Sequence, residues 1–110
     1  MPRLIHARWL DSEVSRTVQQ MAIAVGKEGF IRQQRAIIHR PDSLPTLAGI
    51  RVPTLIVVGA DDQLTPVAEA RLMHERIAGS RLEVLPECGH LPPLEAPERS
   101  LTLLREWLLA

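Results

Sequence analysis

The N-terminal part of the chain places apolar residues with the period of an α-helix. Four of them recur at spacings of four, three and four: Val14, Val18, Met21 and Val25. This spacing puts the four side chains on one face and predicts a helix with Asp11 or Ser12 as its N-cap. Gly26 ends this predicted helix. A second helix is expected over residues 28–39, and Pro41 stops it.

The pattern changes after the second helix. Residues 41–45 combine two prolines with an Asp and a Ser, which predicts a non-helical connector. Residues 54–58 are then apolar or β-branched at every position, so both faces of the predicted strand must be covered, as inside a parallel sheet. A helix follows, in which we expect Thr65 to be the cap, Pro66 the first residue and Gly79 the end.

A second strand is predicted over residues 82–85, which completes a strand–helix–strand unit. The crossover in such a unit is almost always right-handed, and its two strands are therefore parallel. Pro97 opens the last predicted helix, whose apolar side consists of Leu101, Leu104 and Leu108. The predicted fold class is α/β, with N-terminal helices followed by a two-stranded parallel β-α-β-α unit.

Two parallel strands do not form a sheet that buries the strand at residues 54–58 on both sides. Its second edge would be left unpaired, and an apolar unpaired edge promotes association. We therefore expect a partner at this edge, either a second copy of the chain or another chain that supplies the missing part of the sheet.

Composition narrows the possible classes of protein. The 110 residues carry 13 Lys or Arg and 13 Asp or Glu, with 45% hydrophobic content, as expected for one small globular domain. The basic residues form no cluster, which argues against a nucleic-acid or membrane partner. No apolar stretch approaches the roughly 18 residues that span a bilayer, and residues 1–10 lack the apolar block of a signal peptide. Cys88 is the sole cysteine, so we expect no internal disulfide and a cytoplasmic location.

Two polar residues follow the predicted strands. Asp62 lies in the Gly-Ala-Asp-Asp turn after the first strand, and His90 lies in the Glu-Cys-Gly-His segment after the second. Neighbouring strands are about 4.8 Å apart, so an Asp and a His beyond their carboxyl ends can meet. A carboxylate that accepts a hydrogen bond from one imidazole nitrogen leaves the other nitrogen free to remove a proton. We predict that Asp62 and His90 form the acid–base half of a catalytic site.

Nearby residues allow other interpretations. Asp61 is interpreted as a solvated turn residue rather than the functional acid. Cys88 lies close to His90 and could act as a nucleophile, but nothing in the sequence indicates a lowered thiol pKa, and a buried thiol is the commoner fate. A metal site of Asp61, Asp62, Cys88 and His90 would lack the paired spacing of known motifs, so no metal and no cofactor are predicted.

Two stretches of the chain carry recognisable motifs. The first, residues 52–66, contains Leu-Ile-Val-Val-Gly-Ala-Asp-Asp, and the second, residues 78–98, contains Gly-His-Leu-Pro-Pro-Leu-Glu-Ala-Pro-Glu. Together they resemble the C-terminal part of the α/β-hydrolase family. In that family the acid precedes the base, and the separation of 28 residues between Asp62 and His90 is typical of members with this Gly-x-Asp-Asp turn.

The resemblance covers residues 45–110 closely, which implies a hydrolase core segment with Asp62 and His90 as acid and base. Residues 1–44 are expected to be a cap-like helical segment, and residues 35–43 resemble the cap-to-core junction of esterase-like and enol-lactonase-like members. The implied function is hydrolysis of a small-molecule ester or lactone by a Ser–Asp–His mechanism.

The nucleophile of this family lies on a Gly-x-Ser-x-Gly turn. The serines of this chain all lack that setting: Ser12, Ser15, Ser43, Ser80 and Ser100. We therefore expect a chain that retains the acid and the base without the nucleophile and that is weakly active or inactive alone. The alternative hypothesis is a non-catalytic remnant of a hydrolase that associates with itself.

Overall fold

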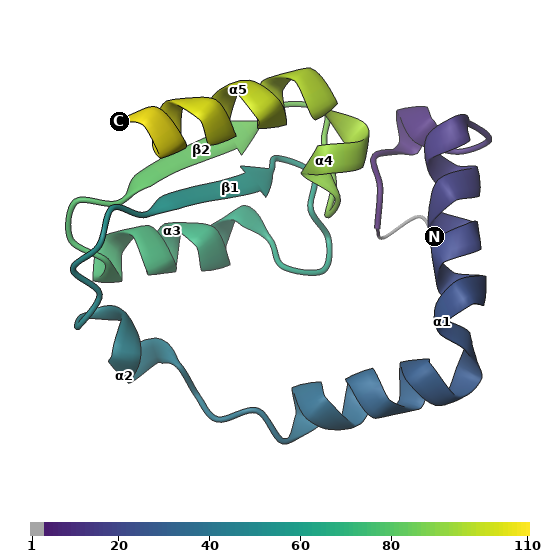
Figure 1. Ribbon diagram of the computed structural model, residues 1–110, viewed down its shortest axis with the longest axis horizontal. Helices are drawn as coiled ribbons and strands as arrows, with labels where there is room; N and C mark the ends of the chain where they lie inside the picture. Colours follow the sequence, from purple (N-terminus) through teal and green to yellow (C-terminus); the bar gives the residue numbers. More distant parts are fainter. Residues whose placement is uncertain (1–3) are drawn as a thin grey trace.

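The computed structural model describes residues 4–110 (Figure 1). Residues 1–3, which belong to the predicted cap-like segment and to the stretch on which the signal-peptide prediction rests, lie outside the described residues. Along the chain the elements are η1 (Ala7–Trp9), α1 (Glu13–Ile38), α2 (Leu44–Leu47), β1 (Leu55–Gly59), α3 (Val67–Arg76), β2 (Arg81–Leu85), α4 (Pro92–Glu95) and α5 (Pro97–Leu109). Helices around a two-stranded parallel sheet make an α/β fold, as predicted.

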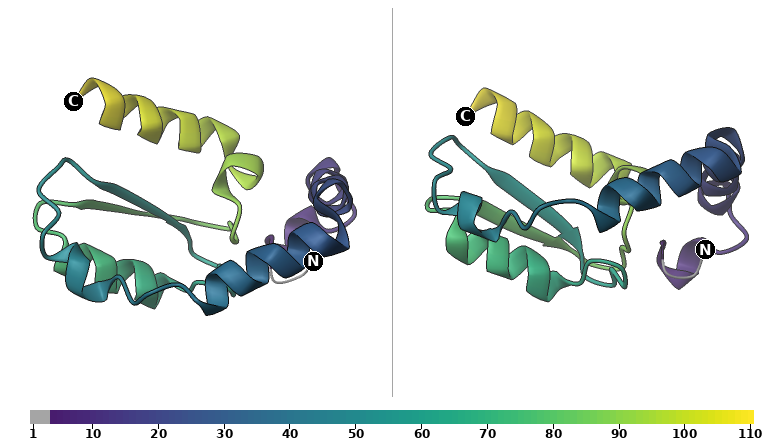
Figure 2. Two further views of the ribbon diagram at one scale, coloured as in Figure 1. Left: turned by 60° about the horizontal axis from the view of Figure 1, so that its bottom comes forward. Right: turned by 90° about the horizontal axis from the view of Figure 1, so that it is seen from below.

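The strands β1 and β2 lie side by side and run parallel, as the strand–helix–strand pattern predicts. Leu55 is opposite Arg81, and Gly59 is opposite Leu85. The helix α3 covers one face of this sheet and α5 covers the other (Figures 1 and 2). The first strand is therefore covered on both faces, as its apolar composition requires.

Alternate residues of β1 enter two separate apolar clusters. The cluster against α3 consists of Ile56, Val58, Ala70 and Ile77. The cluster against α5 consists of Leu85, Cys88 and Leu103, with Leu55 and Val57 packed on it. Because successive side chains of a strand point to opposite faces, this short strand supplies both layers of the core.

The second edge of β1 has no strand beside it within residues 4–110, because the sheet there contains β1 and β2 alone. This is the edge at which the sequence predicts a further strand. The identity of a partner at this edge stays a prediction.

The helix α1 contains the boundary that the sequence predicts. Ser12 is its N-cap and accepts hydrogen bonds from the N–H groups of Val14 and Ser15. Gly26 breaks the helical backbone with φ 73° and ψ 173°, and the helix changes direction there (Figure 1). These angles are essentially restricted to glycine. Within the described part of the chain, no helix has both the length and the apolar character needed to cross a membrane.

Three local predictions are wrong. The apolar side predicted for the last helix is not its packed side, because Leu101, Leu104 and Leu108 are 53%, 48% and 68% exposed and Leu103 is the leucine that is fully buried against the sheet.

The other two concern the ends of helices. The connector over residues 41–45 is not wholly non-helical, because α2 begins at Leu44 inside it. Asp42 Oδ1 accepts a hydrogen bond from the Leu44 N–H at 3.0 Å, and the next residue is a proline at an early helical position, where proline is tolerated. Thr65 is not the cap of α3, whose N-cap is Pro66 and has no side-chain hydrogen bond to the helix.

Candidate functional site

The turns that follow β1 and β2 are joined by backbone hydrogen bonds. The N–H of Ala60 donates to the carbonyl of Leu85 and the N–H of Asp61 donates to the carbonyl of Cys88, both at 2.8 Å. A side chain at Gly59 would overlap the backbone carbonyls of the second turn, so only glycine permits this approach. The sheet and these bonds bring the two turns together.

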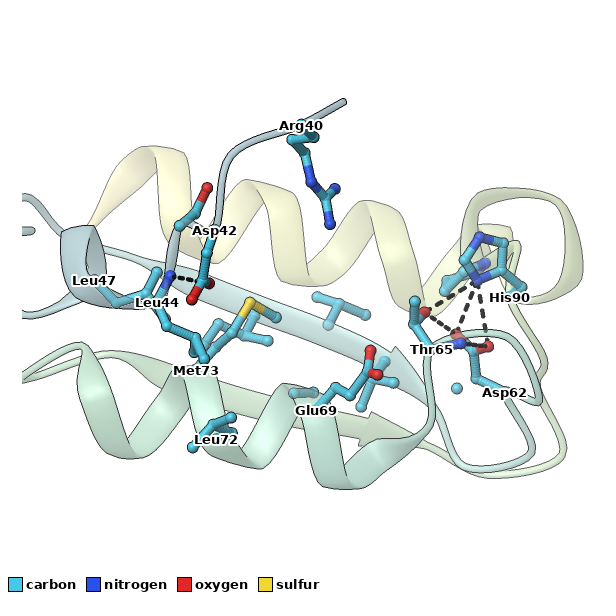
Figure 3. A pocket seen from close by; sticks show the side chains of 17 residues that line it. Arg40, Asp42, Leu44, Leu47, Asp62, Thr65, Glu69, Leu72, Met73 and His90 are labelled. Atoms are coloured by element: carbon cyan, nitrogen blue, oxygen red, sulfur yellow. Dashed lines mark hydrogen bonds and ion pairs between the residues drawn. The ribbon is translucent and has the colours of Figure 1, made fainter. Parts of the chain in front are cut away.

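Asp62 and His90 meet at this junction, as the sequence predicts (Figure 3). The Oδ2 atom of Asp62 lies 3.0 Å from Nδ1 of His90, and Oδ1 lies 3.3 Å from the same nitrogen. The carboxylate is buried, with 5% of its side chain exposed, whereas the imidazole is 33% exposed. The pair therefore combines a shielded acid with a ring that solvent or substrate can reach.

Thr65 completes the hydrogen bonding of this pair and was missed as a site residue. Its hydroxyl donates to Oδ2 of Asp62 at 3.1 Å and lies 3.3 Å from Nδ1 of His90. Its backbone N–H and that of Leu64 both donate to Oδ1 of Asp62 at 3.0 Å. An Asp followed by a Thr three residues later in a turn is the local signal that could have identified this contact.

These contacts control the protonation of the acid. Burial alone would raise the pKa of Asp62, but hydrogen bonds from Thr65, from the His90 ring and from the Leu64 N–H outweigh it, and the net pKa lies below the ordinary value of 3.8. The ionised carboxylate accepts a hydrogen bond from Nδ1–H of His90. That tautomer leaves Nε2 available to accept a proton.

A cavity of about 590 Å³ extends from the pair along the open edge of β1. Apolar side chains of α2 and α3 line much of it, among them Leu47 and Met73, and Arg40 contributes a charged group from the connector (Figure 3). Asp62, Thr65 and His90 lie together at one end of the cavity. A substrate in this space could reach the imidazole.

The other candidate residues have different surroundings. The side chain of Asp61 is 50% exposed, and its Oδ2 lies 3.7 Å from Nε2 of His6, so it makes no contact with the His90 ring. Cys88 is fully buried, and burial together with the Glu95 carboxylate raises the pKa of its thiol to about 11. A thiol with that pKa is protonated at neutral pH and is a poor nucleophile.

Within residues 4–110, no group of three or more His, Cys, Asp or Glu side chains is arranged to hold a metal ion. A second residue that the sequence analysis missed is Glu95, which is buried beside the His90 loop. It accepts hydrogen bonds from the nearby N–H groups of Gly89 and Leu91 and also from the N–H of His6, and the bond to His6 joins segments too far apart in the sequence for a local pattern to reveal it.

Comparison with known proteins identifies the family of the chain. The family model described as "Alpha/beta hydrolase family" matches residues 2–101. A thermophilic esterase from Thermogutta terrifontis has a similar structure, with a TM-score of 0.90 and 36% identity over 97% of this chain and 40% of that one. A second solved structure, described as Est816, an N-acyl homoserine lactone degrading enzyme, has a TM-score of 0.75 and 26% identity over 94% of this chain and 43% of its own.

A curated relative is similar along nearly the whole chain. The pimeloyl-[acyl-carrier protein] methyl ester esterase of Neisseria meningitidis serogroup B is 29% identical over 106 residues, which are 96% of this chain and 41% of that protein. The chain thus spans less than half the length of each of these relatives. The family match, the similar structures and the paired Asp62 and His90 lead to one conclusion: the chain belongs to the α/β-hydrolase family.

Proposed function

We propose that Asp62 and His90 serve as the acid and base of an ester- or lactone-hydrolysing enzyme that works by a Ser–Asp–His mechanism. The observation that carries this proposal is the 3.0 Å contact between a buried, ionised Asp62 and Nδ1 of His90 at the carboxyl ends of two parallel strands. The cavity beside the ring supplies the space for a substrate.

In this proposal, His90 moves protons and Asp62 keeps the ring in place. Nε2 of His90 removes the proton from a nucleophilic hydroxyl as its oxygen bonds to the substrate carbonyl carbon, and then gives that proton to the departing alkoxide. A water molecule, deprotonated by Nε2 of His90, then attacks the acyl carbon of the acyl-enzyme, and the nucleophile takes the proton back as the carboxylic acid product leaves. The negative charge of Asp62 stabilises the imidazolium that forms in each half. The nucleophile comes from outside this sequence, because no serine here lies in a Gly-x-Ser-x-Gly turn.

The names of the similar proteins support the substrate class. They describe an esterase, a methyl ester esterase and an N-acyl homoserine lactone degrading enzyme. The first two names denote cleavage of the bond between an acyl carbon and an alkoxy oxygen, and the substrate of the third contains such a bond in its lactone ring. We assign the same class of bond to this protein, in a small-molecule ester or lactone.

The open edge of β1 is proposed to pair with a strand from outside the described residues. Residues Ile56 to Gly59 line the cavity along this edge, so a strand paired there would occupy the part of the cavity beside β1 and leave for a substrate the end that holds Asp62, Thr65 and His90. Size-exclusion chromatography with light scattering on the purified chain tests self-association. A concentration-independent monomer would exclude pairing with a second copy and favour a segment that supplies the rest of the sheet.

A chimera tests the proposed chemistry. In it, this chain replaces the matching 40% of the Thermogutta terrifontis esterase, to which it is 36% identical. We expect the chimera to hydrolyse p-nitrophenyl esters, and His90→Ala and Asp62→Asn each to lower kcat/KM by about 10⁴-fold. The matched control, Glu98→Gln at an exposed position, should retain activity. We expect the chain by itself to show no more turnover than its own His90→Ala variant.

Two outcomes would count against the proposal. A folded chimera without esterase activity would show that these residues do not complete a hydrolase site. An active chimera in which His90→Ala leaves kcat/KM unchanged would show that the imidazole is not the base.

A further inference from the structure

Glu95 is a buried carboxylate to which the proposed mechanism gives no role. It lies at the end of α4 and is 2% exposed. Its two oxygens accept three backbone hydrogen bonds: Oε1 from the N–H of His6 at 2.6 Å and of Gly89 at 2.9 Å, and Oε2 from the N–H of Leu91 at 2.9 Å. The side chain therefore bonds to the chain on both sides of residue 90.

The three consecutive amides around the base are all held. Glu95 binds the N–H groups of Gly89 and Leu91, and the N–H of His90 itself donates to the carbonyl of Leu4 at 2.8 Å. The same carboxylate also accepts a hydrogen bond from the N–H of His6, two residues after Leu4. One side chain thus connects the His90 loop to the N-terminal stretch that packs on it.

An apolar side chain at this position would avoid desolvation of a carboxylate but would leave three backbone N–H groups without this acceptor. Burial of a carboxylate is costly unless hydrogen bonds replace its hydration, and charge-assisted bonds to backbone N–H groups are among the stronger ones in proteins. Only a carboxylate of this reach can accept bonds from three separate amides at once. What it provides here is the geometry of the loop, since it makes no contact with the imidazole.

We propose that Glu95 is a positioning residue that holds the backbone of His90 so that Nδ1 faces Asp62. The inference rests on the proposed function, because it assigns Glu95 a role through the base. Proton transfer is sensitive to displacements of about 1 Å, which can lower the rate by about 100-fold. The loop that carries the base has no regular secondary structure between β2 and α4, so its position depends on such bonds.

Glu95→Gln tests the inference in the isolated chain. The amide is nearly isosteric, but its NH₂ group faces one set of backbone donors and cannot accept from them. We expect amide hydrogen exchange at Gly89 or Leu91 to become at least about tenfold faster. We also expect the ¹⁵N NMR signature of the Nδ1–H tautomer of His90 to weaken. Glu98→Gln, an exposed carboxylate on the following helix, is the matched control and should change neither readout.

A destabilised variant separates positioning from general loss of stability. Leu103→Ala removes a fully buried side chain from the cluster that contains Cys88 and leaves Glu95 itself in place. At temperatures where both variants are folded, Leu103→Ala should leave the His90 tautomer signature intact. If it weakens that signature as much as Glu95→Gln does, the role of Glu95 is only structural and the inference is wrong.

The chimera supplies a second readout. There Glu95→Gln should lower kcat by about 100-fold with KM nearly unchanged. If Glu95→Gln does not fold, amide hydrogen exchange in the unmodified chain tests the inference. It would be overturned if the amides of His6, Gly89 and Leu91 exchanged as fast as those of exposed turns. Normal tautomer and kcat in Glu95→Gln would also overturn it while leaving the proposed function in place. Absence of the Nδ1–H signature from the unmodified chain would instead contradict the Asp62–His90 pair itself.

Discussion

The long helix α1 and the packed unit from β1 to α5 both carry apolar faces, but these faces have different surroundings. In the packed unit, Ala70 of α3 and Leu103 of α5 are buried against the sheet in two clusters, although other leucines of α5 are about half exposed or more. Along α1 only Ser15 and Val18 are buried, while Ile23 is 79% exposed and Phe30 is 58% exposed. The radius of gyration, 15.4 Å, exceeds the value of about 13 Å expected for a compact domain of this length.

This contrast shows that a helical spacing of apolar residues predicts which side chains share a face of the helix but does not predict which element covers that face. The face of α3 meets a sheet from the same chain, whereas the main contact of α1 with another element of residues 4–110 is with the short η1. The candidate site lies at the edge of the packed unit and takes its bonds from that unit and from the stretch before η1. Its geometry should therefore withstand changes in α1.

The largest expected effect separates the two regions by stability. Leu103→Ala leaves a cavity in the cluster under α5 and should lower the free energy of unfolding by about 3 kcal/mol. Ile23→Ala, at an exposed position of α1, should change it by less than about 0.5 kcal/mol. Urea denaturation followed by circular dichroism measures both. Equal losses in the two variants would mean that α1 is packed as firmly as the sheet.

Two glycines sharpen the comparison with a smaller effect. Alanine at Gly59 would overlap the carbonyls of Cys88 and Gly89, so Gly59→Ala should cost about 1–3 kcal/mol of unfolding free energy and disturb the site. A Cβ at Gly26 meets open space, but the φ of +73° strains any residue other than glycine, so the cost of alanine there comes from the local backbone alone. Gly26→Ala should lower the unfolding free energy by about 1 kcal/mol in urea denaturation and leave the site undisturbed.

The reverse order would contradict this view of the two glycines. If Gly26→Ala destabilises the chain more than Gly59→Ala, the bend in α1 is held by packing. The close approach of the two turns would then be adjustable.

The pH dependence of stability should come from the packed unit. Because the folded state lowers the pKa of Asp62 below 3.8, its ionisation stabilises the fold above that value, and this contribution is lost as the pH falls through the folded pKa. The difference in unfolding free energy between the unmodified chain and Asp62→Asn should therefore shrink as the pH is lowered from about 6 through 3.8. Asp61→Asn, the exposed neighbour, should show no such trend. A difference that grows on acidification would contradict the direction of the pKa shift.

The acid–base pair was predictable because each of its residues lies within a few positions of the end of a predicted strand. Asp62 lies in the turn after β1 and His90 in the loop after β2, and parallel strands place both of these ends at one edge of the sheet. Thr65 was harder to assign because a Thr before Pro at the start of a helix has the same sequence signal whether its hydroxyl caps the helix or, as here, binds Asp62. Local pattern alone does not separate these two partners.

The role of Glu95 and the exposure of α1 depend on non-local contacts. Glu95 binds the N–H of His6, which lies 89 residues away, and no periodicity or motif reports such a bond. The apolar face of α1 satisfies every local rule for a buried helix, yet what covers it depends on which segments lie nearby. Sequence patterns therefore predicted the strands and the pair but not the supports that hold them in place.

The tautomer of the His90 ring decides whether the site is arranged as described. It can be read from long-range ¹H–¹⁵N NMR correlations of the isolated chain at a pH where the ring is neutral. The structure predicts an Nδ1–H tautomer in the unmodified chain and in Asp61→Ala, and its loss in Asp62→Ala, which removes both acceptor oxygens. An Nε2–H tautomer in the unmodified chain would contradict the pairing of acid and base. An Nδ1–H tautomer that persists in Asp62→Ala would contradict it as well.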